Sequence, residues 1–107
     1  MRLLDDEALA RGIAAGFLKD DLPQRLRALK TSLEQNDLRA AEDQAHAIHG
    51  AAANMGGMAL SAIAFELEQA GEAGRADTMA ALVPELERQC ERLTEAMEAW
   101  QEGRNAG

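Results

Sequence analysis

The 107-residue sequence is poor in aromatic residues, proline and cysteine. It has no Tyr, and its aromatic side chains are Phe17, Phe65 and Trp100. Because β-branched residues are scarce as well, the sequence offers little material for a β-sheet core. Ala and Leu dominate instead, which is typical of a helical protein. The length allows one small domain and is too short for two.

The single cysteine and the absence of long apolar runs exclude further classes of protein. Cys90 is the only cysteine, so no intramolecular disulfide can form and no Cys/His spacing for zinc exists. The sequence also lacks a signal-peptide pattern and an apolar run of about 18 residues. We therefore expect a cytoplasmic protein in a reducing compartment, without membrane insertion.

Basic residues are in the minority, and they form no dense run. The formal net charge is −8, from 19 acidic and 11 basic residues. A chain of this charge repels phosphate backbones and anionic lipid headgroups. Nucleic acid and membrane surfaces are therefore not expected as partners.

Apolar residues are present at alternating spacings of three and four, which place one stripe on the inward face of a helix. The stripes predict five helices, the first of them short and opened by Asp5 or Asp6. The inward residues expected on these helices are Leu9, Ile13 and Phe17; Leu22, Leu26, Leu29 and Leu33; Leu38, Ala41, Ala45, Ile48, Ala52 and Met55; Leu60, Ile63, Leu67 and Ala70; and Met79, Val83, Leu86, Cys90, Leu93, Met97 and Trp100.

Capping residues, prolines and glycines predict where the helices end. We expect boundaries at Asp20 or Asp21 with Pro23, at Asn36-Asp37, at Gly56-Gly57, and near Gly71 and Gly74. Pro84 should either kink the last helix or mark its true start.

The intervening loops are short, so neighbouring helices must run antiparallel. The predicted fold is all-α: an up-down antiparallel four-helix bundle with an additional short N-terminal helix. One domain covers residues 1–107, with a core from about 6 to 101 and a frayed tail over 102–107.

The two histidines lie beside the inward stripe of the third helix. His46 and His49 each follow an inward residue by one position, which turns them about 100° around the helix onto a half-exposed flank. Glu42, Gly50 and Ala53 share this flank, and the small residues would let another macromolecule approach closely. The alternative is that the histidines are merely solvated and that the alanines reflect helix propensity and close packing.

Residues 45–57, AHAIHGAAANMGG, resemble the signature of histidine-containing phosphotransfer (HPt) domains. In that family an Ala-His pair precedes an apolar residue, a Lys, a Gly, small residues and a further Gly at the helix end. The resemblance extends over about residues 13 to 97, through Phe17-Leu18, Asp21, Pro23, Leu26, Leu29, Asn36-Asp37, Leu60, Leu67-Glu68 and Pro84-Glu85-Leu86. One position departs from the pattern, because His49 replaces the usual Lys, and a histidine is not a permanent cation.

The resemblance implies that His46 is the phosphoacceptor and that Gly50 leaves room for a docking receiver domain. Such a protein relays a phosphoryl group between receiver aspartates, and the receiver supplies the Mg²⁺ and a lysine. The chain would then be no enzyme, with no kinase or nucleotide site and no cofactor of its own. Its partners would be receiver domains of response regulators or of a hybrid sensor kinase. We expect a monomer, either stand-alone or excised from such a kinase.

Several nearby side chains are candidates for supporting roles. Glu42 and Asp43 lie within one turn of His46 and can hold its second ring nitrogen, with Glu42 preferred because it shares the flank; otherwise both are solvated acids. If the second and third helices are antiparallel about Asn36-Asp37, Arg27 should lie beside His46 and Lys30 near Asp43. Arg27 would then supply part of the missing positive charge, unless it is only a solvated residue.

Two other interpretations remain open: a metal site, and a module that only binds a receiver. Asp43-x-x-His46 has the carboxylate-x-x-His spacing of di-iron bundles, and His46 with His49 could bind one ion. No second such motif exists, which counts against a metal site.

A non-phosphorylated module that only binds a receiver is favoured by His49 at the Lys position, and is opposed by the retained Ala45-His46 and Gly50. Sterics do not exclude His49 as the phosphoacceptor, since Ala53 is at its matching position. The family pattern favours His46.

Overall fold

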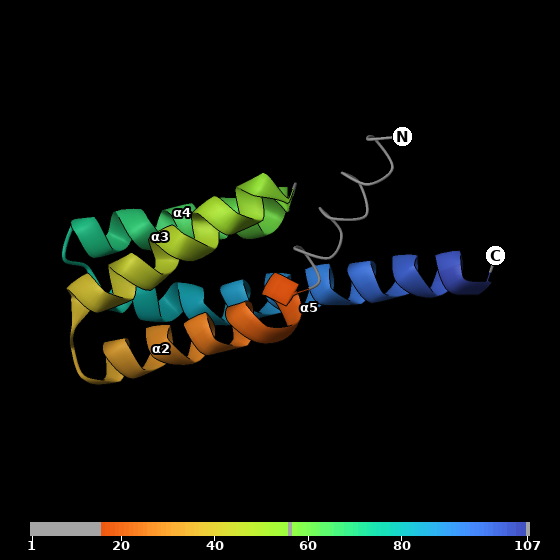
Figure 1. The fold of residues 1–107 in the computed structure, drawn as a ribbon. Coiled ribbons are helices and arrows are strands. Elements are labelled where there is room, and N and C mark those ends of the chain that lie inside the picture. Colours follow the sequence, from red (N-terminus) through yellow and green to blue (C-terminus); the bar gives the residue numbers. More distant parts are fainter. Residues whose placement is uncertain (1–15, 56, 107) are drawn as a thin grey trace.

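The computed structural model describes residues 16–55 and 57–106, with side chains through Ala99, and this part of the chain is helical without strands. A π-helical turn is followed by four helices packed in a bundle (Figure 1). The elements are η1 (Phe17–Asp21), α2 (Leu22–Glu34), α3 (Leu38–Asn54), α4 (Met58–Glu72) and α5 (Ala76–Ala106). The predicted all-α four-helix bundle is confirmed. Most of the expected first helix, with Leu9 and Ile13, and the tail residue Gly107 lie outside the described residues.

Helices α3 and α4 form one side of the bundle, and α2 and α5 form the other (Figure 1). The most extensive packing is between α3 and α4, followed by that of α4 with α5 and of α2 with α3. α5 is the longest helix and extends beyond the ends of the others (Figure 1). The α3–α4 pair carries both histidines.

The core consists mostly of the residues that the periodicity places inward; Leu18 and Ala64 are buried without having been expected, and Phe17 is only partly buried. On α3 the four buried side chains are Ala41, Ala45, Ile48 and Ala52. The buried hydrophobic residues of the other elements are Leu18, Leu22, Leu29, Leu60, Ile63, Ala64, Leu67, Ala70, Met79, Val83, Leu86 and Cys90. Each fully buried Leu or Ile stabilises the fold by roughly 1.5–3 kcal/mol. Leu26, Leu33, Leu38, Met55, Leu93 and Met97 are partly buried against this core, while the side chain of Trp100 lies outside the described part.

The turn between α2 and α3 follows the sequence prediction. Asn36 has a φ of 59°, in the left-handed region that Asn adopts more readily than most residues. The side chain of Asp37 then accepts a hydrogen bond of 3.1 Å from the backbone N–H of Ala40. This N-cap fixes where α3 begins and therefore how far His46 lies from the turn.

The expected boundary is confirmed in part, because α2 begins after Asp21 with Pro23 in its first turn, but the expected acidic cap is wrong and the backbone stays helical from η1 into α2. Asp21 has helical dihedral angles and makes no capping bond; it accepts a 2.8 Å bond from Nε of Arg25 instead. Pro23 lacks an N–H, and its ring conflicts with the carbonyl four residues earlier. The wider π turn, closed by the N–H of Leu22 on the carbonyl of Phe17, relieves that conflict without ending the helix.

The last helix begins well before its proline. α5 starts at Ala76 and contains Pro84, so Pro84 does not mark the start of this helix. Met79 is fully buried in the preceding turns, which gives this segment its own anchor in the core.

Candidate functional site

His46 and His49 differ in exposure although they share one flank of α3. The side chain of His46 is 72% exposed and that of His49 is 32% exposed. The sequence predicts half exposure for both, and only His49 approaches it. An external reactant can therefore reach His46 more readily than His49.

Both imidazoles bind the carboxylate of Glu68 on α4. Nδ1 of His46 lies 2.7 Å from Oε2, and Nδ1 of His49 lies 3.2 Å from Oε1. A carboxylate can only accept hydrogen bonds, so each Nδ1 carries the proton and donates it. Each Nε2 then keeps its lone pair, and the exposed Nε2 of His46 is a free nucleophile.

The position of Glu68 follows from the antiparallel pairing of α3 and α4. His46 and Glu68 both lie eleven residues from Gly57. His49 and Phe65 both lie eight residues from it, and their ring centroids are 5.1 Å apart with a tilt of 44°. Counting outward from Gly57 along the sequence predicts these pairs. From the sequence alone, Glu68 is part of the family resemblance but has no predicted role.

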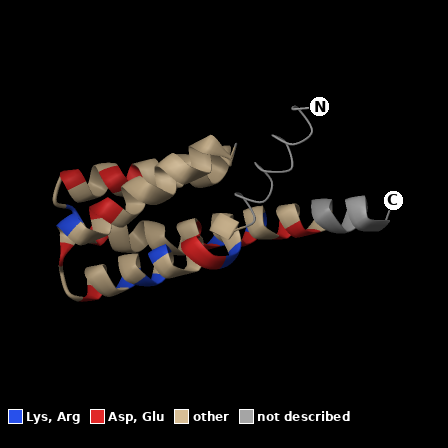
Figure 2. Cartoon of the chain, in the orientation of Figure 1, with Lys and Arg blue, Asp and Glu red and all other residues tan. Residues whose placement is uncertain are grey.

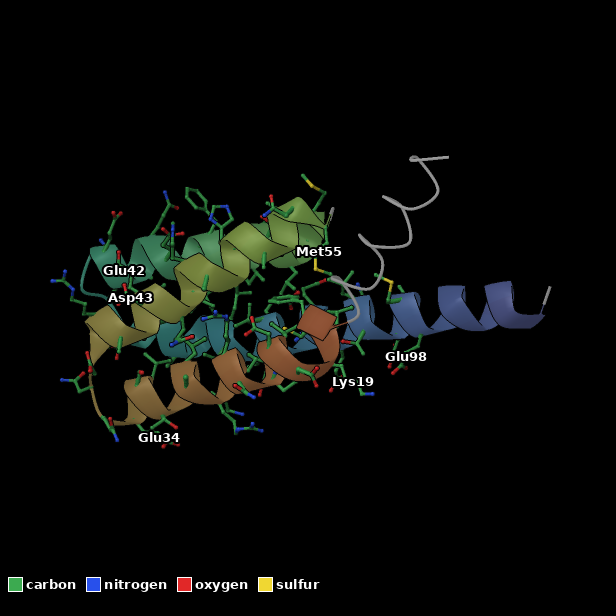
Figure 3. All side chains as sticks on the ribbon, viewed as in Figure 1. Lys19, Glu34, Glu42, Asp43, Met55 and Glu98 are labelled. Atoms are coloured by element: carbon green, nitrogen blue, oxygen red, sulfur yellow. The ribbon has the colours of Figure 1, made fainter. Side chains whose placement is uncertain are left out.

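The expectation that Glu42 or Asp43 holds the second ring nitrogen of His46 is wrong. Glu68 occupies that position, and within residues 16–55 and 57–106 neither acid bonds to His46. A Cβ built on Gly71 would lie 3.0 Å from Cβ of Glu42, so Glu42 packs over α4 instead. Figure 3 shows Glu42 and Asp43 in the first half of α3, toward the turn from α2.

The expected positions of Arg27 and Lys30 are also wrong. Nζ of Lys30 lies 2.6 Å from Oε2 of Glu87 on α5, and not near Asp43. Arg27 is exposed and, among the described residues, makes no hydrogen bond or ion pair. It lies on the same flank of α2 as Lys30. The flank that faces α3 instead carries Arg25, whose Nη1 donates to Oε1 of Gln44.

On each helix, a residue that follows an inward residue by one position points about 100° away from the core, toward the next helix around the bundle. For α2 that helix is α5, whereas for α3 it is α4. The flank of Arg27 and the flank of His46 therefore lie on opposite faces. The position of Arg27 does not support a role at the phosphoryl group.

From His46 toward Gly57, the surface of the α3–α4 pair is uncharged and has room for a partner. No Asp, Glu, Lys or Arg occurs from Gln44 to Phe65, and Figure 2 shows the corresponding parts of α3 and α4 without charge. Gly50 is exposed, and a Cβ added there would meet no atom within 4 Å. Ala53 is exposed one turn further along α3. Met58 and Phe65, both on α4, are 73% and 44% exposed.

Two other groups of the described residues bear on the chemistry. His46, His49 and Glu68 offer ligand atoms that all lie within 4.8 Å of one another. Cys90 is buried, and burial together with the negative charges of Glu87 and Glu91 raises its pKa to about 12. A thiol that remains protonated is a poor nucleophile, so Cys90 is a core residue.

The comparisons with known proteins identify the family. A protein-family model described as Hpt domain matches residues 15–103, and the chain therefore belongs to the Hpt domain family. Comparison with curated protein sequences gave no match, and neither did comparison with solved structures. Within the described residues, no helix combines the length and apolarity that a membrane span requires.

Membership of this family defines the kind of chemistry. An Hpt domain is a histidine phosphotransfer intermediate of a phosphorelay, not a kinase, and it interacts with receiver domains. At His46 this chain combines an exposed imidazole with space for a partner.

Proposed function

We propose that His46 is the phosphoacceptor and that this protein relays a phosphoryl group between the aspartates of two receiver domains. The observation that carries the proposal is the bond from Nδ1 of His46 to Glu68, which leaves Nε2 as an exposed nucleophile. Gly50 gives clearance one turn further along the same face. Of the two histidines, His46 has the more accessible ring.

In the transfer step, the lone pair of Nε2 attacks phosphorus as the bond between phosphorus and the receiver's aspartate oxygen breaks. The aspartate leaves as a carboxylate, and the imidazole ring acquires positive charge. Glu68 stabilises that charge through Nδ1–H, since hydrogen bonds to charged groups are stronger than neutral ones. Donation to the next receiver is the reverse reaction, so one geometry serves both directions.

The remaining chemistry comes from the partner. A receiver domain supplies the Mg²⁺ and the lysine that offset phosphoryl charge, and this chain needs no cofactor of its own. His49 stands where the family has a Lys and makes the second hydrogen bond to Glu68, which helps to hold the carboxylate at His46. We expect a cytoplasmic monomer whose partners are receivers of response regulators or of a hybrid sensor kinase.

The decisive experiment is labelling by receivers that have been charged with acetyl phosphate. The wild-type chain should take up label that is acid-labile and base-stable, as phosphohistidine is. His46→Gln should abolish the labelling, and His49→Gln should still be labelled, more slowly. Labelled His46→Gln with unlabelled His49→Gln would reassign the site to His49, and no label from any receiver would indicate a module that only binds.

A further inference from the structure

We infer that His46, His49 and Glu68 together bind one transition-metal ion of the Zn²⁺ class, and that this ion and the phosphoryl group exclude each other. The inference starts from side chains on two helices whose donor atoms converge. Nδ1 of His46 and Nδ1 of His49 both face the carboxylate of Glu68, at 2.7 and 3.2 Å.

The separations between the donor atoms fit a tetrahedral ion. Zn²⁺ binds imidazole nitrogen and carboxylate oxygen at about 2.0–2.2 Å, which puts ligand atoms roughly 3.3–3.5 Å apart. The nitrogen–oxygen distance of 3.2 Å at His49 is close to this value, whereas the 2.7 Å at His46 is shorter and must lengthen on binding; all the donor atoms lie within 4.8 Å of one another. The 72% exposed ring of His46 is free to turn by the small amount required.

The other two ligands are already held in place. Glu68 is only 19% exposed, and the ring of His49 lies against Phe65 at a centroid distance of 5.1 Å. Because a docked ion would meet ordered ligands, less conformational entropy is lost on binding than at a flexible surface pair. No Lys or Arg occurs from Gln44 to Phe65 to repel a cation.

The types of ligand select the class of metal. Two imidazoles and one carboxylate suit Zn²⁺ and its neighbours in the first transition row, whereas Mg²⁺ and Ca²⁺ prefer sets of oxygen ligands. Three protein ligands leave a fourth position for water. The di-iron arrangement considered from the Asp43-x-x-His46 spacing is a different site, and Asp43 takes no part in this one.

The proton balance explains why the ion opposes phosphorylation. Without metal, each ring carries its proton on Nδ1 and keeps a lone pair on Nε2. When Nδ1 binds the ion, its proton moves through solvent to Nε2 of the same ring, with no net release. Nε2 of His46 then has an N–H in place of the lone pair that would attack phosphorus. The ion therefore acts as an inhibitor and not as a cofactor.

Metal binding is tested on the protein alone. Titration with Zn²⁺ by calorimetry should show one site, and Co²⁺ should give the visible absorption bands of a tetrahedral complex. His49→Gln and Glu68→Gln should each weaken binding at least tenfold, whereas Glu66→Gln, an exposed acid of the same helix, should leave it unchanged. Equal affinity in wild type and Glu68→Gln, or no binding to the wild type, overturns the inference.

The competition with phosphoryl transfer rests on the proposed function and is measured separately. Zn²⁺ at tenfold its Kd, with Mg²⁺ held constant, should lower labelling of the wild type by about tenfold. His49→Gln should lose this sensitivity, and labelling of the receiver alone by acetyl phosphate controls for effects on the partner. A wild type that binds Zn²⁺ but takes no label from any receiver contradicts the proposed function and leaves the metal site standing. A labelled wild type whose rate is unaffected by bound Zn²⁺ contradicts the exclusion.

Discussion

Oε2 of Glu68 lies 2.7 Å from Nδ1 of His46, although 22 positions separate the two residues in the sequence. The bond selects the ring tautomer and positions an anion where imidazole charge develops during transfer. It makes Glu68 a positioning residue in the proposed reaction, since it acts through His46 and not on the phosphoryl group.

Glu68→Gln should slow labelling of His46 by roughly ten- to a hundredfold, since a hydrogen bond to a charged group is worth about 1.5–3 kcal/mol. Glutamine preserves size, so the unfolding transition should change little. Nitrogen chemical shifts of the His46 ring should show Nδ1–H in the wild type and a mixture of tautomers in the variant. Glu66→Gln is the matched control, and equal rates for the two variants would rule out this role.

Gly50→Leu should fold normally and yet accept phosphate poorly. A side chain at this position meets no atom of the protein within 4 Å, so it projects into the space that a docking receiver needs. We expect at least a tenfold loss in apparent affinity for the receiver, measured by surface plasmon resonance. Ala81→Leu, at an exposed position on α5, controls for added surface hydrophobicity and should bind like the wild type.

The same substitution at two glycines should change stability in opposite directions. Gly50→Ala fills open space in the middle of α3 and should stabilise the protein by about 0.5–1 kcal/mol. Gly71→Ala puts a Cβ 3.0 Å from Cβ of Glu42 and 3.3 Å from Cε of Met79, so α3 and α4 must separate slightly. That should cost about 1–3 kcal/mol. Urea unfolding followed by circular dichroism measures both, and a shift of the same sign would contradict the packing argument.

Cys90 should resist alkylation in the folded protein. Burial first, and then the charges of Glu87 and Glu91, raise its pKa from 9.0 to about 12, so the thiolate is scarce at pH 8. Iodoacetamide should modify it quickly only after addition of denaturant. Between pH 9 and 12 the unfolded chain loses the thiol proton while the folded chain keeps it, so this contribution to stability falls as pH rises. The stability difference between wild type and Cys90→Ala should therefore shrink across that range, and rapid alkylation of the folded protein would contradict the burial of Cys90.

The sequence was sufficient to predict which residues of α3 face the core, because a 3.6-residue period leaves only one inward stripe. Ala41, Ala45, Ile48 and Ala52 are all buried, as expected. It was also sufficient for the Asn36-Asp37 turn, whose conformation and cap depend on local chemistry.

Contacts between helices were harder to predict. Glu42 and Asp43 were considered for His46 because they lie within one turn, whereas the actual partner is on α4. Periodicity gives the direction of the core but not which helix occupies each flank. It therefore predicts Lys30 near Asp43, whereas Lys30 binds Glu87. The π turn before Pro23 depends on how the chain accommodates a missing N–H, and the same residues would be compatible with a break.

The alanines on the inward face of α3 affect how His46 meets its partners. Ala41, Ala45 and Ala52 are fully buried and have no side-chain rotamers, so the backbone that carries His46 is fixed directly against its neighbours. When a receiver docks, little more than the two side-chain torsions of His46 has to be ordered. Association with a receiver should therefore proceed as rigid-body docking, with a rate governed by diffusion and orientation and not by rearrangement of the bundle.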